Sequence, residues 1–507
     1  MDIQSLRQEV RPEVIKKINP HMLQFIQFRH RDLTGKIHPR LLLTRNRFDL
    51  MAKYIYAKFQ ESGIDSGWGL HVYYGHIRAF NNFQEQGSVE KTGKDAFIAA
   101  FHNILESIKK EGFDEDTSIV PVLDENLILD GSHRTAACLL YNKEVACLLV
   151  DINPLVNRAV LEYSYSYFRE KGLANTCSDA MALEYCRLKN NTYVVTVFPS
   201  AVGKDEQVKK VLQEYGEIIY EKSVHLLNEG PINLIKQVYG NENWLGNWSD
   251  DFSGARAKAA ACFRYDGLAR VFVIESGNLE KVTEAKAKIR KLFNIDKHSV
   301  HINDTHEETI HLAQILLNDN SIHFLNHARP RNYAKFYQLL DNYQEWLTGK
   351  NLDKECFCID SSAVMAAYGI REPGDLDFLH HGHEQIILDK ADIESNADIE
   401  SNNDKQPYHA KPVDDIIYNP ENHFYYNGLK FATLDVIKNM KKNKGKLKDL
   451  EDIHKIDQFL AFSQNNRIRF YLKYLFNPWN SYIASRKFLT LLRKIKAASS
   501  RLKSNNT

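Results

Sequence analysis

Two aspartates separated by one residue, Asp375 and Asp377, follow a Pro-Gly turn. In an extended strand the side chains alternate between faces, so both carboxylates would point to one side and Leu376 to the other. Carboxylate oxygens are natural ligands of Mg²⁺, and phosphoryl or nucleotidyl transfer depends on a divalent metal more than on covalent help from the protein. An Asp-x-Asp pair also occurs on ordinary half-exposed strands, so the neighbouring residues decide between the two interpretations.

A small-residue turn precedes the acidic pair. Asp360, Ser361 and Ser362 come directly before the helical segment AVMAAYG. Serine hydroxyls and the free backbone N–H groups at a helix start can both contact phosphate groups. The turn therefore predicts a nucleotide-phosphate contact beside the acidic strand. The candidates for a third carboxylate are Asp414, Asp415 and Asp435.

Residues 349–462 resemble the nucleotidyltransferase-fold superfamily, especially the branch that includes the abortive-infection type nucleotidyltransferases. The shared features are the small-residue helix start, the Tyr-Gly-Ile-Arg segment, the Asp-x-Asp strand and the stretch GLKFATLDVIKNMKKNKGKLKDLEDIHKI. The resemblance implies that Asp375 and Asp377 are catalytic and bind Mg²⁺ or Mn²⁺. It also implies nucleotide binding by Ser361, Ser362 and Lys441. The superfamily usually has paired glycines or Gly-Ser where this chain has Asp-Ser-Ser, and a domain that has lost catalysis is the alternative.

A second candidate site is the run Asp130-Gly131-Ser132-His133-Arg134, between a predicted strand and a helix that opens at Thr135. Backbone donors at the helix start, together with His133 and Arg134, would form a compact anion site. A plain strand-to-helix turn would explain the glycine but not the adjacent histidine and arginine. The pattern therefore favours a functional site.

Residues 119–152, IVPVLDENLILDGSHRTAACLLYNKEVACLLVDI, resemble the ParB/sulfiredoxin superfamily. The resemblance implies that Asp130, Gly131, Ser132, His133 and Arg134 hold nucleotide phosphates. Sulfiredoxins carry a cysteine where this chain has Ser132, which argues against their redox chemistry. No helix-turn-helix pattern or basic stripe follows, which argues against DNA partitioning. Small-molecule kinases of the free-serine type belong to the same superfamily.

The middle of the chain is rich in histidine and tryptophan. The segment NDTHEET predicts a helix start that Asp304 or Thr305 can cap, and a phosphate or sugar-nucleotide contact there. Trp244 and Trp248 lie in a glycine-containing loop that runs into a helix. Aromatic side chains in such a loop either stack on sugars or bases or fill a core, and the sequence leaves both open.

The elements that would position these residues predict an α/β (α+β) multidomain protein. The length of 507 residues alone favours about three domains. Hydrophobic periodicity predicts helices over 48–60, 95–113, 282–293 and 333–347, and strands over 192–201, 217–227 and 269–276. The predicted domains are a ParB/sulfiredoxin-like phosphate-binding domain (1–155), a helical connector (156–190), a central α/β domain (191–348), a nucleotidyltransferase-like domain (349–462) and a basic aromatic tail (463–507).

Bulk properties exclude several classes of protein. The net charge of +1 gives no general attraction to nucleic acid. The seven cysteines lack the paired spacing of a zinc module and predict buried, reduced thiols, with Cys356 and Cys358 on one face of a strand. No signal peptide or membrane-spanning run is evident, so we expect a cytoplasmic protein. The tandem hexapeptide ADIESNADIESN at 391–402 predicts a solvated loop.

Residues 463–507 contain no acidic residue and interleave basic with aromatic side chains. Such a segment suits an anionic membrane surface. RNA is the competing partner, and docking of the segment on its own protein is the third interpretation.

The leading functional hypothesis is a magnesium-dependent nucleotidyl- or phosphotransferase that uses ATP or another nucleoside triphosphate. By analogy, and from the basic tail, we expect it to act in bacterial surface-polysaccharide biosynthesis, on a glycan or lipid-linked acceptor at the inner membrane face. One alternative is a small-molecule or glycan kinase that uses the ParB/sulfiredoxin-like domain. Another is a nucleic-acid-associated defence or toxin protein.

Overall fold

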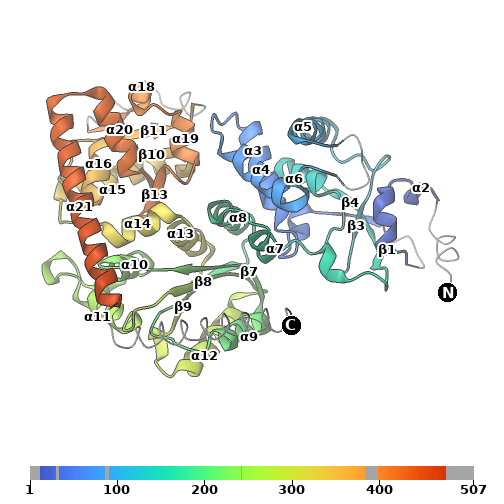
Figure 1. The fold of residues 1–507 in the computed structure, drawn as a ribbon, viewed down its shortest axis with the longest axis horizontal. Helices are drawn as coiled ribbons and strands as arrows, with labels where there is room; N and C mark the ends of the chain where they lie inside the picture. The colour runs from blue at the N-terminus through green and yellow to red at the C-terminus, as the bar shows by residue number, and fades with distance from the viewer. Residues whose placement is uncertain (1–11, 30–33, 86–90, 241, 383–397, 476–507) are drawn as a thin grey trace, which may run out of the picture. The chain divides into compact units, whose positions relative to one another are not determined.

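The computed structural model describes residues 12–29, 34–85, 91–240, 242–382 and 398–475 (Figure 1). Within these ranges the chain is a mixed α/β protein in which small sheets lie among helices, as the sequence predicted. Residues 1–439 form one compact unit and residues 440–507 form a second. No helix in the described ranges is long and apolar enough to cross a membrane.

The first part of the larger unit packs helices against a three-stranded sheet of order β2-β4-β3. Strands β2 and β4 are antiparallel, and β3 and β4 are parallel. Helix α5 buries Phe97, Phe101, Leu105 and Ile108 on one face, the spacing expected of an amphipathic helix. The elements are β2 (Thr34–Ile37), α3 (Asp49–Glu61), α4 (Trp68–Asn81), α5 (Lys94–Glu111), β3 (Val120–Val122), α6 (Ser132–Tyr141) and β4 (Val145–Leu149). Shorter elements here are α2 (Pro12–Ile15), η1 (Pro20–Gln24), η2 (Pro39–Leu42) and the paired strands β1 (Ile26–Gln27) and β5 (Asp151–Ile152).

The connector is less regular than predicted. It contains a short 3-10 helix, η3 (Arg158–Leu161), followed by α7 (Tyr165–Glu170) and α8 (Asn175–Leu188). Ser164 interrupts the helical path because it is extended and caps α7 through its hydroxyl, which accepts a hydrogen bond from the Tyr167 N–H.

The central part is built on a four-stranded antiparallel sheet of order β7-β8-β6-β9. Its strands are β6 (Thr192–Val197), β7 (Glu217–Val224), β8 (Ala269–Glu275) and β9 (Val300–Ile302). Strand β6 is buried along its whole length, and its alternate residues Tyr193, Val195 and Val197 pack with α9 and α12. Val194 belongs to the hydrophobic cluster on the opposite face. The helices are α9 (Asp205–Tyr215), α10 (Gly230–Val238), α11 (Ser253–Cys262), α12 (Leu279–Phe293), α13 (His306–Leu316) and α14 (Asp319–His327).

The last part of the larger unit contains a five-stranded mixed sheet of order β12-β11-β10-β14-β13. Its central strand β10 runs antiparallel to β11 and parallel to β14. The strands are β10 (Phe357–Asp360), β11 (Leu376–His380), β12 (Ile399–Ser401), β13 (His423–Tyr426) and β14 (Leu429–Ala432). The accompanying helices are α15 (Ala334–Gly349), α16 (Ser361–Ala367), α18 (Gln406–His409) and α19 (Val413–Tyr418).

Two sequence expectations are wrong in this part. The second copy of the hexapeptide is not simply a solvated loop: it forms β12, which pairs in parallel with β11. The first copy lies outside the described residues. Cys356 and Cys358 do not share a strand, because Cys356 ends the 3-10 helix η7 (Lys354–Cys356) and only Cys358 lies in β10. The prediction of free thiols is confirmed, and six of the seven are buried.

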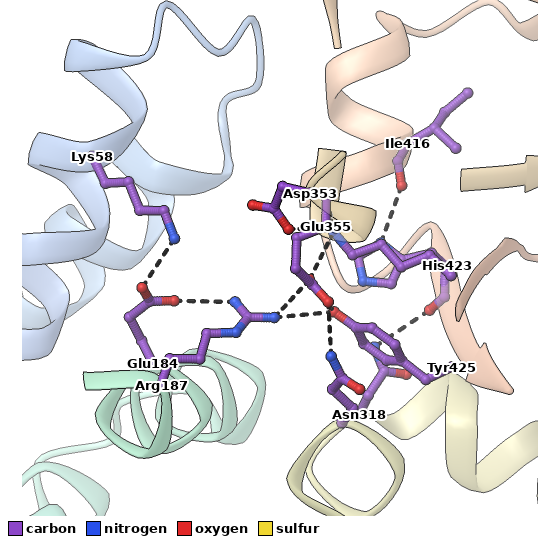
Figure 2. Close-up of polar contacts among 11 residues, drawn as sticks. Lys58, Glu184, Arg187, Asn318, Asp353, Glu355, Ile416, His423 and Tyr425 are labelled. Atoms are coloured by element: carbon purple, nitrogen blue, oxygen red, sulfur yellow. Dashed lines mark hydrogen bonds and ion pairs between the residues drawn. The ribbon is translucent and has the colours of Figure 1, made fainter. Parts of the chain in front are cut away.

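Charged side chains connect the first helices with the five-stranded sheet region (Figure 2). The guanidinium of Arg187 on α8 donates hydrogen bonds to Glu184 (3.1 Å) and to Glu355 in η7 (2.6 Å). Lys58 on α3 pairs with the other oxygen of Glu184 at 3.0 Å. The Tyr425 hydroxyl on β13 donates to Glu355 at 3.1 Å. Helices α3 and α8 are therefore tied to β13 and η7 by charge-assisted hydrogen bonds.

The second compact unit begins within α20 (Leu434–Lys444) and continues into α21 (Leu447–Leu475). Here the Lys441 ammonium is buried and contacts Asp452 at 2.8 Å and Asp449 at 3.4 Å. Of the predicted basic aromatic tail, residues 476–507 lie outside the described residues.

Candidate active site

The β10–β11 ladder brings the predicted acidic residues together with a carboxylate that the sequence interpretation had not counted. Asp377 on β11 lies opposite Asp360 on β10. On its other side Asp377 lies opposite Glu400 of β12. Asp377 is half-buried, and Asp375, just before β11, is exposed. Four carboxylates therefore gather at this end of three adjacent strands.

The surroundings of Asp377 disfavour its negative charge. Burial, and then the nearby charges of Asp375 and Asp360, raise the pKa of Asp377 to about 7. A hydrogen bond from Ser361 opposes this rise in part. No lysine, arginine or histidine pairs with Asp375 or Asp377 among the residues that the structure describes. A cation placed beside them would relieve this repulsion.

Asp360 is fully buried at the bottom of the cluster. Its Oδ2 accepts hydrogen bonds from Asn402 Nδ2 at 2.8 Å and contacts His409 Nε2 at 3.0 Å. Burial favours protonation, but the His409 hydrogen bond and charge lower the pKa of Asp360 below its ordinary value. Its other oxygen, Oδ1, has no hydrogen-bond partner in the described part of the chain. One buried acceptor is thus left open next to Asp377.

The two serines of the turn contact the acidic cluster. The Ser361 hydroxyl accepts a hydrogen bond from Asn402 at 3.1 Å, and the Ser362 hydroxyl donates to Asp375 at 3.4 Å. Ser361 has a φ of 55°, in the left-handed region that non-glycine residues seldom adopt. The turn therefore holds an uncommon backbone conformation directly at the site.

Two of the three earlier candidates for a third carboxylate, Asp414 and Asp415, are engaged by other residues, and the third, Asp435, lies in the first turn of α20. Asp414 contacts His381 Nδ1 at 2.9 Å and accepts a hydrogen bond from the Asp65 N–H at 2.8 Å. Asp415 accepts from the Ser66 hydroxyl at 2.7 Å. Both carboxylates thus fix α19 to the loop between α3 and α4. The sequence offered a signal for Asp360, since it stands in the same short turn as the serines, but only the strand pairing shows that it faces Asp377.

The residues present fit a Mg²⁺ ion that keeps ligands from water and substrate better than a metal ion held by protein ligands alone. Over the described ranges no group of three or more histidine, cysteine or acidic side chains could hold a metal ion. Mg²⁺, however, is commonly held by one or two carboxylates together with water and substrate phosphates. Asp375 and Asp377 would supply these carboxylates, and the open oxygen of Asp360 adds a nearby acceptor.

The second candidate site, at the start of α6, is a close-packed turn. Gly131 has a φ of 78°, and a Cβ there would lie 2.8 Å from the Val120 side chain, so only glycine fits. Helix α6 begins at Ser132, one turn earlier than predicted. Asp130 and Arg134 are partly exposed and contact each other at 3.5 Å. These two side chains can meet a ligand.

His133 lies in a different environment from its neighbour Arg134. Its Nε2 contacts the Tyr73 hydroxyl at 2.9 Å, and its ring packs edge-on against Phe101. Burial, and then the charge of Lys53, lower the pKa of His133 well below its ordinary value. The imidazole is therefore neutral at physiological pH and brings no positive charge to a phosphate.

The structure adds a buried charged cluster beside this turn that sequence reasoning missed. Asp49 at the start of α3 accepts two hydrogen bonds from Arg47, both 2.8 Å, and one from Lys53 at 2.7 Å. Lys53 also contacts His76 at 3.2 Å. Burial lowers the pKa of Lys53 to about 8, although Asp49 opposes the shift. The signal was Asp49 and Lys53 one helical turn apart in the mostly apolar first half of the helix.

The central part contains the predicted helix cap. Thr305 and Glu308 form a reciprocal capping box at the start of α13, so this polar segment has a structural role. No protein-family model, curated protein or solved structure matches this chain. Its candidate sites therefore rest on the geometry of its own residues.

Proposed function

We propose that the chain is a magnesium-dependent nucleotidyl- or phosphotransferase whose active site is the acidic end of β10, β11 and β12. The observation that carries the proposal is the carboxylate cluster around Asp377. Asp377 itself lacks a basic partner in the described residues, and its pKa is raised. Strongly shifted pKa values of this kind gather at functional sites. An ordinary half-exposed strand would place Asp375 and Asp377 in water without a buried carboxylate opposite.

Each residue of the site has a separate role in the proposal. Asp375 and Asp377 would hold the metal, which when bound neutralises phosphate charge and aligns the reacting oxygens. Asp360, fixed by Asn402 and His409, keeps Asp377 in place and maintains negative potential beneath it. Ser362 orients Asp375 through its hydroxyl.

The turn conformation supports the proposed relationship to the nucleotidyltransferase-fold superfamily. Ser361 adopts a positive φ, which glycine adopts without strain. The superfamily places glycine in this turn, so the backbone path is one that a glycine-containing turn would also follow. The full burial of the Asp360 carboxylate leaves the space above the turn less crowded than the residue types alone suggest.

The proposal also includes a class of acceptor and a pathway. A role in surface-polysaccharide biosynthesis, with a glycan or lipid-linked acceptor, follows from analogy and from the basic composition of residues 463–507. Binding to the inner membrane face would proceed through those residues. Nucleotidyl transfer would release pyrophosphate from the donor, and phosphoryl transfer would release a nucleoside diphosphate.

The test uses the full chain with a nucleoside triphosphate and Mg²⁺, and separates pyrophosphate from nucleoside diphosphate by chromatography. We expect Asp375→Asn and Asp377→Asn each to lower turnover by about a hundredfold or more, because each removes a charge needed in the transition state. Arg134→Met, which changes the other candidate site, should retain turnover. Retained activity in both aspartate variants would refute the proposal.

A second candidate function is a kinase that uses the turn before α6. The observation in its favour is Lys53, buried with a lowered pKa beside that turn, where it could balance phosphate charge. The same experiment distinguishes the two candidate functions. Loss of nucleoside diphosphate release in Arg134→Met, together with full activity in Asp377→Asn, would show that the reaction takes place at this second site.

A further inference from the structure

Two adjoining cavities border the central part, and none of their lining residues belongs to either candidate site. The larger has a volume of about 370 Å³ and is bordered by α10, the 3-10 helix η5 (Trp248–Asp250), α11 and residues 328–330. The smaller has a volume of about 190 Å³ and is lined by aromatic groups that include Tyr337 and Tyr426. The larger volume falls within the range of pockets that hold small ligands. The residues that line both cavities are Asn233, Lys236, Trp248, Phe252 and Pro330.

The loop that forms one wall is tightly organised. The Asp250 carboxylate accepts hydrogen bonds from the Asn247 N–H (2.7 Å), the Phe252 N–H (3.1 Å) and the Ser253 hydroxyl (2.9 Å). Gly254 passes so close to the Trp244 carbonyl that a Cβ would lie 1.8 Å from its oxygen. These contacts hold Trp248 and Phe252, which border the cavities, in defined positions. The wall is thus preformed rather than assembled by a ligand.

Three basic side chains border the larger cavity, and its two acidic side chains form their ion pairs with Arg256. Arg256 pairs with Asp251 at 2.9 Å and lies 3.8 Å from Glu229. Lys236 instead places its ammonium 3.5 Å from the centre of the Phe252 ring and 4.8 Å from that of Trp248. Within the described ranges Lys236 makes no ion pair or hydrogen bond. Arg329 is the third basic residue at this cavity.

The position of Lys236 is electrostatically costly. Burial, and then the positive charge of Arg256, lower the pKa of Lys236 to about 8. Contact with two aromatic faces compensates in part, since ring faces attract cations. An anion in the cavity would supply the missing partner and would raise this pKa again.

We propose that the paired cavities bind a small ligand that carries a phosphate at one end and a planar ring at the other, as a nucleoside monophosphate does. The phosphate would lie in the larger cavity against the ammonium of Lys236, which makes no ion pair in the described ranges, with Arg256 at the same cavity. The ring would lie in the smaller cavity against Trp248 and Tyr337, which offer aromatic surface. The site is separate from the proposed active site and does not depend on it.

Site-resolved chemical labelling of lysines tests this proposal on the full chain. The protein is acetylated with limiting reagent, with adenosine monophosphate or inorganic phosphate as the probe, and the modification of each lysine is measured by mass spectrometry. We expect adenosine monophosphate to protect Lys236, at a concentration about tenfold or more below that needed with inorganic phosphate, because ring stacking adds to phosphate binding. The exposed Lys291 on α12 is the control and should remain unprotected.

Two variants separate the contributions of phosphate and ring. Trp248→Leu should weaken protection by adenosine monophosphate about tenfold and leave protection by inorganic phosphate unchanged. Arg256→Met should weaken protection by both. Failure of both probes to protect Lys236, equal protection by the two probes, or unchanged protection in Trp248→Leu would each overturn the proposal. Retained far-UV circular dichroism confirms that each variant is folded.

Discussion

At the scale of single residues, surroundings rather than residue type distinguish the aspartates of this chain. Asp360 and Asp377 face each other across one ladder, yet the pKa of Asp360 is lowered by His409 and the pKa of Asp377 is raised to about 7. One carboxylate is held ionised by its own protein. The other holds its proton up to about neutral pH, and a cation beside it would favour its ionised form.

This contrast predicts a pH-dependent cost of Asp377 in the metal-free protein. Its pKa in the folded protein lies above the ordinary value, so between about pH 4 and about pH 7 the unfolded chain releases this proton while the folded protein keeps it, and the fold loses stability as pH rises. We expect Asp377→Asn to raise the free energy of unfolding at pH 8 by about 1–3 kcal/mol, and by about half as much at pH 5.5, where only part of the difference in ionisation has developed. Urea unfolding at the two pH values measures the difference.

The matched control is Asp116→Asn, at an exposed position. It should change the free energy of unfolding by less than about 0.5 kcal/mol at either pH. A gain for Asp377→Asn that is equal at pH 5.5 and pH 8 would contradict the assigned pKa. Stabilisation together with loss of turnover would identify Asp377 as a residue kept for function at a cost to stability.

At the scale of elements, the second copy of the duplicated hexapeptide takes part in the five-stranded sheet. The second copy contributes β12 and, in Asn402, a buried donor to Asp360. Because both copies have the same sequence, deletion of residues 391–396 leaves a chain that still contains every residue of β12 and Asn402.

We therefore expect this deletion to shift the melting temperature by no more than about 2 °C, since it keeps every residue of β12 and the hydrogen-bond donor Asn402. Asn402→Ala should instead cost about 1–3 kcal/mol, because Asp360 and Ser361 lose a buried hydrogen-bond donor. Differential scanning calorimetry compares the two variants. A deletion as costly as Asn402→Ala would show that the first copy also supports the sheet.

At the scale of the larger compact unit, Arg187 is the central group of a charge network between distant parts of the chain (Figure 2). Burial alone would raise the pKa of Glu355, but the charges of Lys430 and then Arg187 hold it well below its ordinary value. A lowered pKa means that this network stabilises the fold above about pH 4.5 and loses its effect as pH falls further.

Arg187→Met should lower the free energy of unfolding by about 1–3 kcal/mol at pH 7, because Glu184 and Glu355 lose a shared partner while partly buried. The effect should shrink below about pH 4.5, where the unfolded chain protonates its glutamates. Arg158→Met removes exposed ion pairs and should cost less than about 1 kcal/mol. Equal losses for Arg187→Met and Arg158→Met in urea unfolding would contradict this role.

The predictable elements are those whose own residues carry a long periodic pattern. Helices α3, α5, α12 and α15 and strands β6, β7 and β8 match the sequence expectations, because hydrophobic periodicity survives any reasonable tertiary arrangement. Short elements escaped prediction. Strand β12 is only three residues long and exists because β11 offers an edge with which it pairs, and the break before α7 depends on one capping serine.

The sequence by itself determined the mixed α/β class, the acidic pair at the start of a strand and the turn before it, because these follow from residue type and spacing. The tertiary structure decided which groups meet: Asp360 opposite Asp377, Lys53 beside His133, and Lys236 against Trp248 and Phe252. The physical reason is that burial and the sign of neighbouring charges set the protonation and binding properties of a side chain. Both depend on residues far apart in the sequence, and only folding brings these together.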